Sequence, residues 1–144
     1  MNAFPWLTVL TLVPVVGALF VLSFGGSNKN VARWIALIFS FVALAITLFM
    51  WAHFDSASGA LQFQQQVPWI AALGVQYHVG IDGLGLLMLA LSAIVVPMAM
   101  AASWQIQEKT SLYFSLILML EAGLFGTFTA LNFFHWFLFW ELSL

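Results

Sequence analysis

Two glutamates set inside long apolar runs are the residues of this sequence best suited to chemistry. Glu141 lies in the aromatic run 133–144, FFHWFLFWELSL, and Glu121 lies near the middle of the apolar run 111–131. A carboxylate surrounded by hydrocarbon persists by pairing with a cation, by facing water or by taking up a proton. Two such groups suit a proton relay, because each holds or releases a proton when the charge of the other changes.

A purely structural role is the alternative for both glutamates. A protonated glutamate that hydrogen-bonds between helices also fixes their packing. The small residues Ala122, Gly123 and Gly126 beside Glu121 favour a packing face there, so this alternative weighs more for Glu121 than for Glu141. We predict that Glu141 is the principal proton carrier and that Glu121 is an additional relay.

Other polar residues have simpler explanations. Asp82 precedes an apolar run and is expected to cap a helix, while the surrounding GIDGLG lacks the spacing and preceding strand of a dinucleotide site. His53, His78 and His135 are too scattered for a local metal motif and are expected at membrane interfaces with one wet face. We therefore expect neither a metal site nor a bound cofactor in this chain.

Composition identifies a membrane protein and excludes several other classes. Hydrophobic residues make up 64% of the chain and charged residues 6%, and the mean hydropathy is +1.07. The net charge is −2 and the basic residues are Lys29, Arg33 and Lys109, too few to bind a nucleic-acid backbone. The absence of cysteine excludes disulfides and cysteine-ligated iron–sulfur or zinc centres. We also expect no other redox centre in this chain.

Apolar runs separated by polar connections predict an all-α, polytopic membrane helix bundle. The five predicted spans are residues 4–24, 31–54, 81–102, 111–131 and 133–144, the last of them incomplete. Residues 55–80 are rich in glutamine and turn residues and are expected to form an external loop. Alternation in residues 61–67 and 75–79 predicts a small β-hairpin within that loop, between the second and third helices.

Positive charge sets the expected orientation. Lys29 and Arg33 follow the first span and Lys109 follows the third, so both connections are expected on the cytoplasmic side. Glu141 would then lie ~12 Å from the external end of the fifth helix, and Glu121 ~15 Å from the cytoplasmic end of the fourth. Both carboxyl groups are therefore expected near the midplane, on antiparallel neighbouring helices, where they could approach each other.

The fifth span is too short to cross a bilayer within this sequence. About 12 residues at ~1.5 Å each cover ~18 Å of a ~30 Å hydrocarbon core. We therefore expect residues 1–144 to form one membrane domain that is the front part of a longer protein or one half of a split one. Arg33, at the very start of the second span, is the single basic residue within the predicted spans and is far from the depth of Glu141, so a cationic partner for Glu141 is expected in further sequence or in another subunit.

Three stretches together resemble one family: VPWIAALGVQYHVGIDGLGLLML at 67–89, LEAGLFGTFTAL at 120–131 and FWELSL at 139–144. Their order and separation resemble the antiporter-like membrane subunits of respiratory complex I, NADH:quinone oxidoreductase, and most of all the M-type or subunit 4 chain. The L-type and N-type chains and the subunits of multi-subunit cation/proton antiporters are similar relatives.

The resemblance implies a subunit of a redox-driven proton pump, with Glu141 as a proton-channel residue paired with a lysine on a later helix. It implies other membrane subunits of complex I and the lipid bilayer as partners, with NADH and quinone handled by partner subunits. A bacterial inner membrane is expected rather than an organellar one. Two alternatives stay open: a subunit of a multi-subunit cation/proton antiporter, or a truncated scaffold that does not conduct.

Overall fold

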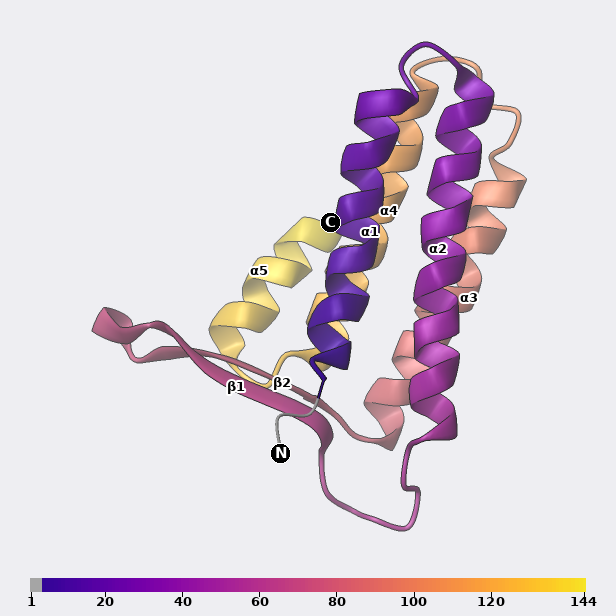
Figure 1. The fold of residues 1–144 in the computed structure, drawn as a ribbon. Helices are drawn as coiled ribbons and strands as arrows, with labels where there is room; N and C mark the ends of the chain where they lie inside the picture. Colours follow the sequence, from indigo (N-terminus) through magenta and orange to yellow (C-terminus); the bar gives the residue numbers. More distant parts are fainter. Residues whose placement is uncertain (1–3) are drawn as a thin grey trace.

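Four long helices, a short fifth helix and one β-hairpin make up the computed structural model, which describes residues 4–144 (Figure 1). Residues 1–3 of the predicted domain lie outside the described residues. The elements are α1 (Trp6–Phe24), α2 (Lys29–Ala52), β1 (Gln62–Ile70), a 3₁₀ turn (Ala71–Leu73), β2 (Val75–Ile81), α3 (Gly83–Ala102), α4 (Thr110–Thr129) and α5 (Phe133–Ser143).

The four long helices are each long and apolar enough to cross a membrane, which makes the chain a multi-pass membrane protein. The predicted all-α fold with a small hairpin is confirmed, and the helix bounds differ from the prediction by up to two residues. The second helix starts at Lys29 rather than residue 31 because Asn28 caps it, its side chain accepting a hydrogen bond from the Asn30 amide at 2.9 Å. The third starts at Gly83 because Ile81 belongs to β2.

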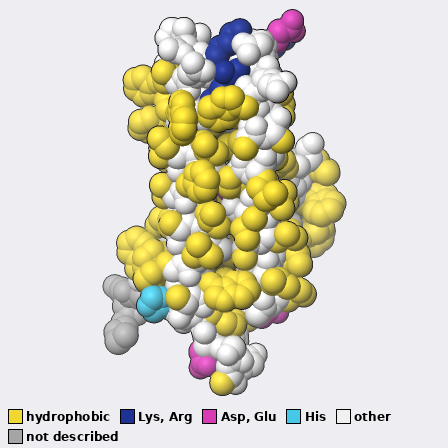
Figure 2. Space-filling model, turned by 90° about the vertical axis from the view of Figure 1, so that its right-hand side faces the viewer, with side chains coloured by type: hydrophobic (Ala, Val, Ile, Leu, Met, Phe, Trp, Pro, Cys, Tyr) yellow, Lys and Arg dark blue, Asp and Glu magenta, His cyan; other side chains and the backbone are white. Residues whose placement is uncertain are grey.

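The helices are arranged around α4, which packs against α1, α2, α3 and α5. Small side chains fill much of the interior, for example Ala36, Ala43 and Ala93, each fully buried. Large apolar side chains such as Leu19, Ile38 and Leu91 are instead exposed on the outside. Figure 2 shows hydrophobic side chains along the length of one face of the bundle. This distribution fits a bundle whose solvent is lipid, where close helix packing rather than hydrophobic burial holds the helices together.

Apart from Glu121 and Glu141, the charged side chains lie toward the two ends of this bundle. Lys29 and Arg33 begin α2 and Lys109 precedes α4, so the α1–α2 and α3–α4 connections form what we call the basic end (Figures 1 and 2). The opposite, hairpin end carries β1 and β2 together with Asp55 and Asp82. The alternation of the predicted topology is thus confirmed, with both basic connections at one end of the molecule.

The hairpin lies across the end of the bundle and contacts the start of α5 (Figure 1). β1 and β2 are antiparallel, with Val67 opposite Tyr77, and Gly74 provides the left-handed turn residue at φ 65°. A bridge between Val79 and Ala130, and a hydrogen bond from the Leu131 amide to the His78 carbonyl at 3.0 Å, attach β2 to the α4–α5 connection. The hairpin therefore fixes where α5 begins.

Asp82 caps α3, as the sequence predicts. Its side chain accepts a hydrogen bond from the Gly85 amide at 2.7 Å. We expect Asp82→Ala to cost about 1 kcal/mol of local stability, because the first turn loses its cap. Hydrogen exchange of the Gly85 amide should then accelerate about fivefold. Asp82→Asn retains an acceptor and should exchange like the wild type, and equal exchange in Asp82→Ala would contradict the capping role.

Candidate functional site

Glu121 is a buried carboxyl group at mid-depth in the bundle. It is the twelfth residue of α4, its side chain is 0% exposed, and the Ser40 hydroxyl of α2 donates a hydrogen bond to its Oε1 at 3.3 Å. Its Oε2 atom has no hydrogen-bond partner among residues 4–144. The basic residues are about two to three turns away at the basic end, since Arg33 precedes Ser40 by seven residues in α2 and Thr110 begins α4 there. Glu121 therefore lacks a cationic partner within this part of the chain and needs a proton or water to remain there.

Glu141 lies on α5 and has a different environment from the expected one. Its side chain is exposed on the outside of the bundle and makes no hydrogen bond within the described residues. Phe134, Phe137, Leu138 and Glu141 follow helical spacing and are all exposed, so they share one uncovered face of α5. The expected burial of Glu141 is thus not found within residues 4–144, because no other helix of this part of the chain covers that face.

The register between α4 and α5 places the two glutamates at similar depths. A Cβ atom at Gly123 would lie 2.9 Å from the Ser143 amide nitrogen, and one at Gly126 would lie 2.0 Å from Cδ1 of Phe139. These close approaches place Glu141 about one helical turn from the level of Glu121. The side chains lie on different faces, since Glu121 bonds to α2 whereas Glu141 is exposed. A direct approach of the two carboxyl groups stays a prediction.

The small residues beside Glu121 form a packing face, as the sequence suggests. Gly123 and Gly126 allow α5 to approach α4 so closely that a side chain at either position would meet α5 atoms under 3.0 Å away. Ala122 is fully buried in the same stretch. Glu121 therefore lies beside a close contact between α4 and α5.

His135 lies in a different environment from the one that the sequence predicts. It is buried, 2% exposed, rather than at a wet interface, and neither ring nitrogen has a hydrogen-bond partner in the described part of the chain. Its ring stacks on Phe139 at 4.6 Å and lies 5.2 Å from the Tyr77 ring of β2. The hairpin covers the base of α5, which is why the expected water contact is lost. The four-residue spacing of His135 and Phe139, which places both on one face of a helix, is the sequence feature that could have indicated this contact.

Tyr77 also connects the hairpin to α1. Its hydroxyl lies 2.7 Å from the Thr8 hydroxyl, which in turn hydrogen-bonds the Gln65 side chain of β1. Burial raises the pKa of the Tyr77 phenol, while the Thr8 hydrogen bond lowers it by less. The phenol therefore stays protonated at neutral pH and serves as a hydrogen-bonding link between α1 and β2.

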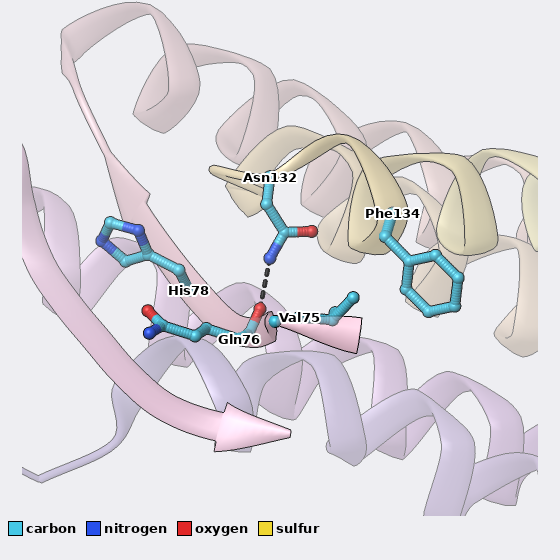
Figure 3. Close-up of a pocket in the computed structure, with 6 residues that line it drawn as sticks. Val75, Gln76, His78, Asn132 and Phe134 are labelled. Atoms are coloured by element: carbon cyan, nitrogen blue, oxygen red, sulfur yellow. Dashed lines mark hydrogen bonds between the residues drawn. The ribbon is translucent and has the colours of Figure 1, made fainter. Parts of the chain in front are cut away.

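The other histidines are at the hairpin end with exposed or partly exposed rings, as predicted. His53 Nδ1 lies 2.9 Å from the Phe49 carbonyl, and His78 Nε2 lies 3.4 Å from Gln64 Oε1. A shallow cavity of about 240 Å³ lies beside His78, where Asn132 Nδ2 donates a hydrogen bond to the Gln76 carbonyl (Figure 3). Within residues 4–144, no group of three His, Cys, Asp or Glu side chains could hold a metal ion.

A multi-pass helical bundle with a buried carboxyl group at mid-depth defines the class of this protein as a polytopic membrane domain with an intramembrane ionisable site. No protein-family model matches the chain. The chain is nevertheless a homologue of the amino-terminal part of NAD(P)H-quinone oxidoreductase chain 4 and F(420)H(2) dehydrogenase subunit M. The family resemblance seen in the sequence is confirmed.

Three relatives show the extent of this similarity. The chain is 34% identical over 142 residues to NAD(P)H-quinone oxidoreductase chain 4 2 of Thermosynechococcus vestitus, covering 98% of this chain and 27% of the relative. It is 38% identical over 141 residues to F(420)H(2) dehydrogenase subunit M of Methanosarcina mazei, covering 97% and 28%. It is 30% identical over 145 residues to the chloroplastic chain 4 of Chara vulgaris, covering 100% and 29%. The chain thus spans just over a quarter of the length of these relatives.

Proposed function

We propose that this chain is the front part of a proton-translocating membrane subunit of an NADH:quinone oxidoreductase in a bacterial inner membrane. The observation that carries the proposal is the buried carboxyl group of Glu121 at mid-depth, on the helix that packs directly against the one bearing Glu141. Ionisable groups at this depth are costly and mark ion or proton pathways in membrane proteins. The similarity to subunits of an NAD(P)H-quinone oxidoreductase and of an F(420)H(2) dehydrogenase favours a redox-driven pump over a cation/proton antiporter.

Glu141 is proposed as the carboxyl group that takes up and releases the transported proton. Its exposed position on α5 supports this role, because the uncovered face leaves the carboxyl group open to further membrane segments. The three basic residues of this chain all lie toward the basic end. A cationic partner at the depth of Glu141 would therefore come from elsewhere in the full-length protein or from a neighbouring subunit, as would the NADH and quinone sites.

Glu121 is proposed as a second proton-holding group. The Ser40 hydroxyl bonds only one of its oxygens, so Oε2 is free to carry a proton or to accept a bond from water. A change in the charge of Glu141, about one helical turn away in depth, would alter the proton affinity of Glu121 through the low-dielectric interior. The two glutamates would then couple their protonation states within the membrane domain.

Glu121→Gln is expected to lower redox-driven proton translocation a few-fold, with less effect than the same change at Glu141. Glutamine retains the shape and can accept the Ser40 hydrogen bond, but it cannot exchange a proton. The measurement is the initial rate of proton uptake by membrane vesicles per NADH oxidised, made on the full-length protein in its complex. Ser40→Ala is the companion variant, because it removes the hydrogen bond and leaves the carboxyl group.

A packing role for Glu121 predicts a different pattern. Glu121→Gln would then assemble and pump like the wild type, whereas Glu121→Leu would impair assembly of the complex. Wild-type coupling in Glu121→Gln would therefore remove Glu121 from the relay, and the proposal for Glu141 would stand on its own.

A further inference from the structure

An open cavity at the basic end lies between the α1–α2 connection and the start of α4. Its volume is about 370 Å³, and two lysines, Lys29 and Lys109, line it. Lys29 begins α2 and Lys109 directly precedes α4, so two segments about 80 residues apart place positive charge on one hollow. Figure 2 shows Lys and Arg side chains gathered at this end above the apolar surface.

The two lysines are available for a ligand, whereas Arg33 is used by the fold. Arg33 is buried, donates to the Ile106 carbonyl and to Asn30 Oδ1 at 2.9 Å each, and lies over the Trp104 ring. Lys29 and Lys109 are both exposed, and Lys29 Nζ donates only a long 3.4 Å bond to the neutral Gln107 side chain. Two ammonium groups that make no strong hydrogen bond within the described fold thus line the same cavity.

Part of the cavity lining is apolar and exposed on the outside of the bundle. Leu22 and Leu112 line it and are 51% and 46% exposed, on the outer surfaces of α1 and α4. A ligand that fills both parts has an anionic head beside the lysines and apolar tails beside the leucines. The depth is that of the membrane interface, because both helices end or begin there.

We propose that this cavity binds the phosphate headgroup of an anionic glycerophospholipid in the leaflet at the basic end. The ammonium groups of Lys29 and Lys109 neutralise the phosphate, and the start of α4 presents the positive end of its dipole to the same space. The apolar part of the lining favours a lipid over free phosphate, because acyl chains can pack against it whereas free phosphate has no apolar group to do so. Bound lipid would join α1 to α4 at the end of the bundle opposite the hairpin.

The experiment compares phosphatidylglycerol with phosphatidylcholine as probes, using native mass spectrometry of the full-length protein in detergent. The decisive variant is Lys109→Gln/Gln105→Lys, which moves the charge within the same exposed loop to a residue that does not line the cavity. The charge of the loop and of the protein is unchanged. We expect phosphatidylglycerol to bind the wild type preferentially, and the variant about fivefold more weakly, because one interfacial lysine contributes about that factor.

Each outcome bears on the proposal. Equal binding of phosphatidylglycerol by the wild type and the variant would overturn it, as would equal binding of the two lipids by the wild type. Inorganic phosphate is the third probe. Displacement of the lipid by millimolar phosphate would show that the cavity is a simple anion site and would contradict the proposal that it binds a lipid. Helical content measured by circular dichroism verifies that the variant is folded, and Lys29→Gln tests the second lysine independently.

Discussion

Replacing Glu141 by glutamine in the full-length protein within its complex is expected to lower proton translocation by roughly tenfold or more, since a positioned proton donor and acceptor contributes ~10²-fold or more to a proton transfer. Glutamine has nearly the size of glutamate and keeps hydrogen-bonding capacity, but it can neither bind nor release the transported proton. The measurement is proton uptake into sealed membrane vesicles driven by NADH oxidation. NADH oxidation with an artificial acceptor should remain, because no redox centre is expected in this chain.

Glu108→Gln is the matched control for that variant. Glu108 is exposed in the α3–α4 connection, outside the spanning helices, so the same chemical change there should leave coupling unaltered. The amount of assembled complex is compared by native gel electrophoresis, so that loss of assembly is not taken for loss of pumping. Full proton-coupled activity in Glu141→Gln would contradict the role assigned to this residue.

Gly126→Ala is expected to produce the second large effect, on stability. A Cβ atom at position 126 would lie 2.0 Å from Cδ1 and 2.2 Å from Cγ of Phe139, far inside contact distance. The Phe139 ring or the whole of α5 must move, and overpacking of this kind costs about 1–3 kcal/mol. The measurement is the temperature at which half of the detergent-solubilised full-length protein loses its monodisperse peak in size-exclusion chromatography, and we expect it to fall.

Two further variants separate this clash from a general effect of removing glycine. Gly83→Ala in α3 is the control, because a Cβ atom there meets nothing within 4 Å. Phe139→Leu introduced into Gly126→Ala should recover part of the loss by vacating the contested space. If Gly126→Ala were as stable as Gly83→Ala, the close approach of α5 to α4 would be wrong, and with it the relative depth of the two glutamates.

The positions of the helices and of the hairpin could be predicted from the sequence, because each produces a recognisable pattern of residue types along the chain. Long apolar runs bounded by Asn28, Asp82 or Asn132 mark the helices, and all three residues cap them in the structure. Alternation marks the hairpin, although β1 extends through Pro68 to Ile70, beyond the predicted end at residue 67. The difference arises because Pro68 lies in an edge strand, where its missing amide donor is tolerated.

Which face of each helix is buried could not be predicted from the sequence. This explains why the environments of the site residues differ from those expected. In a membrane bundle the lipid-facing and interior surfaces are both apolar, so periodicity does not separate them. The depths of Glu121 and Glu141 follow from counting residues along each helix. That Glu121 faces Ser40, that Glu141 is exposed, and that the hairpin buries His135 all depend on tertiary packing.

Proton translocation by the purified complex containing this chain, reconstituted in proteoliposomes, tests the proposed function most directly. The quantity is the change in lumenal pH on adding NADH and quinone, followed with a trapped pH-sensitive dye and collapsed by a protonophore. The proposal predicts a pH change that requires both substrates and that proceeds without sodium. Quinone reduction with no movement of protons, or proton movement driven only by an imposed sodium gradient, would contradict it.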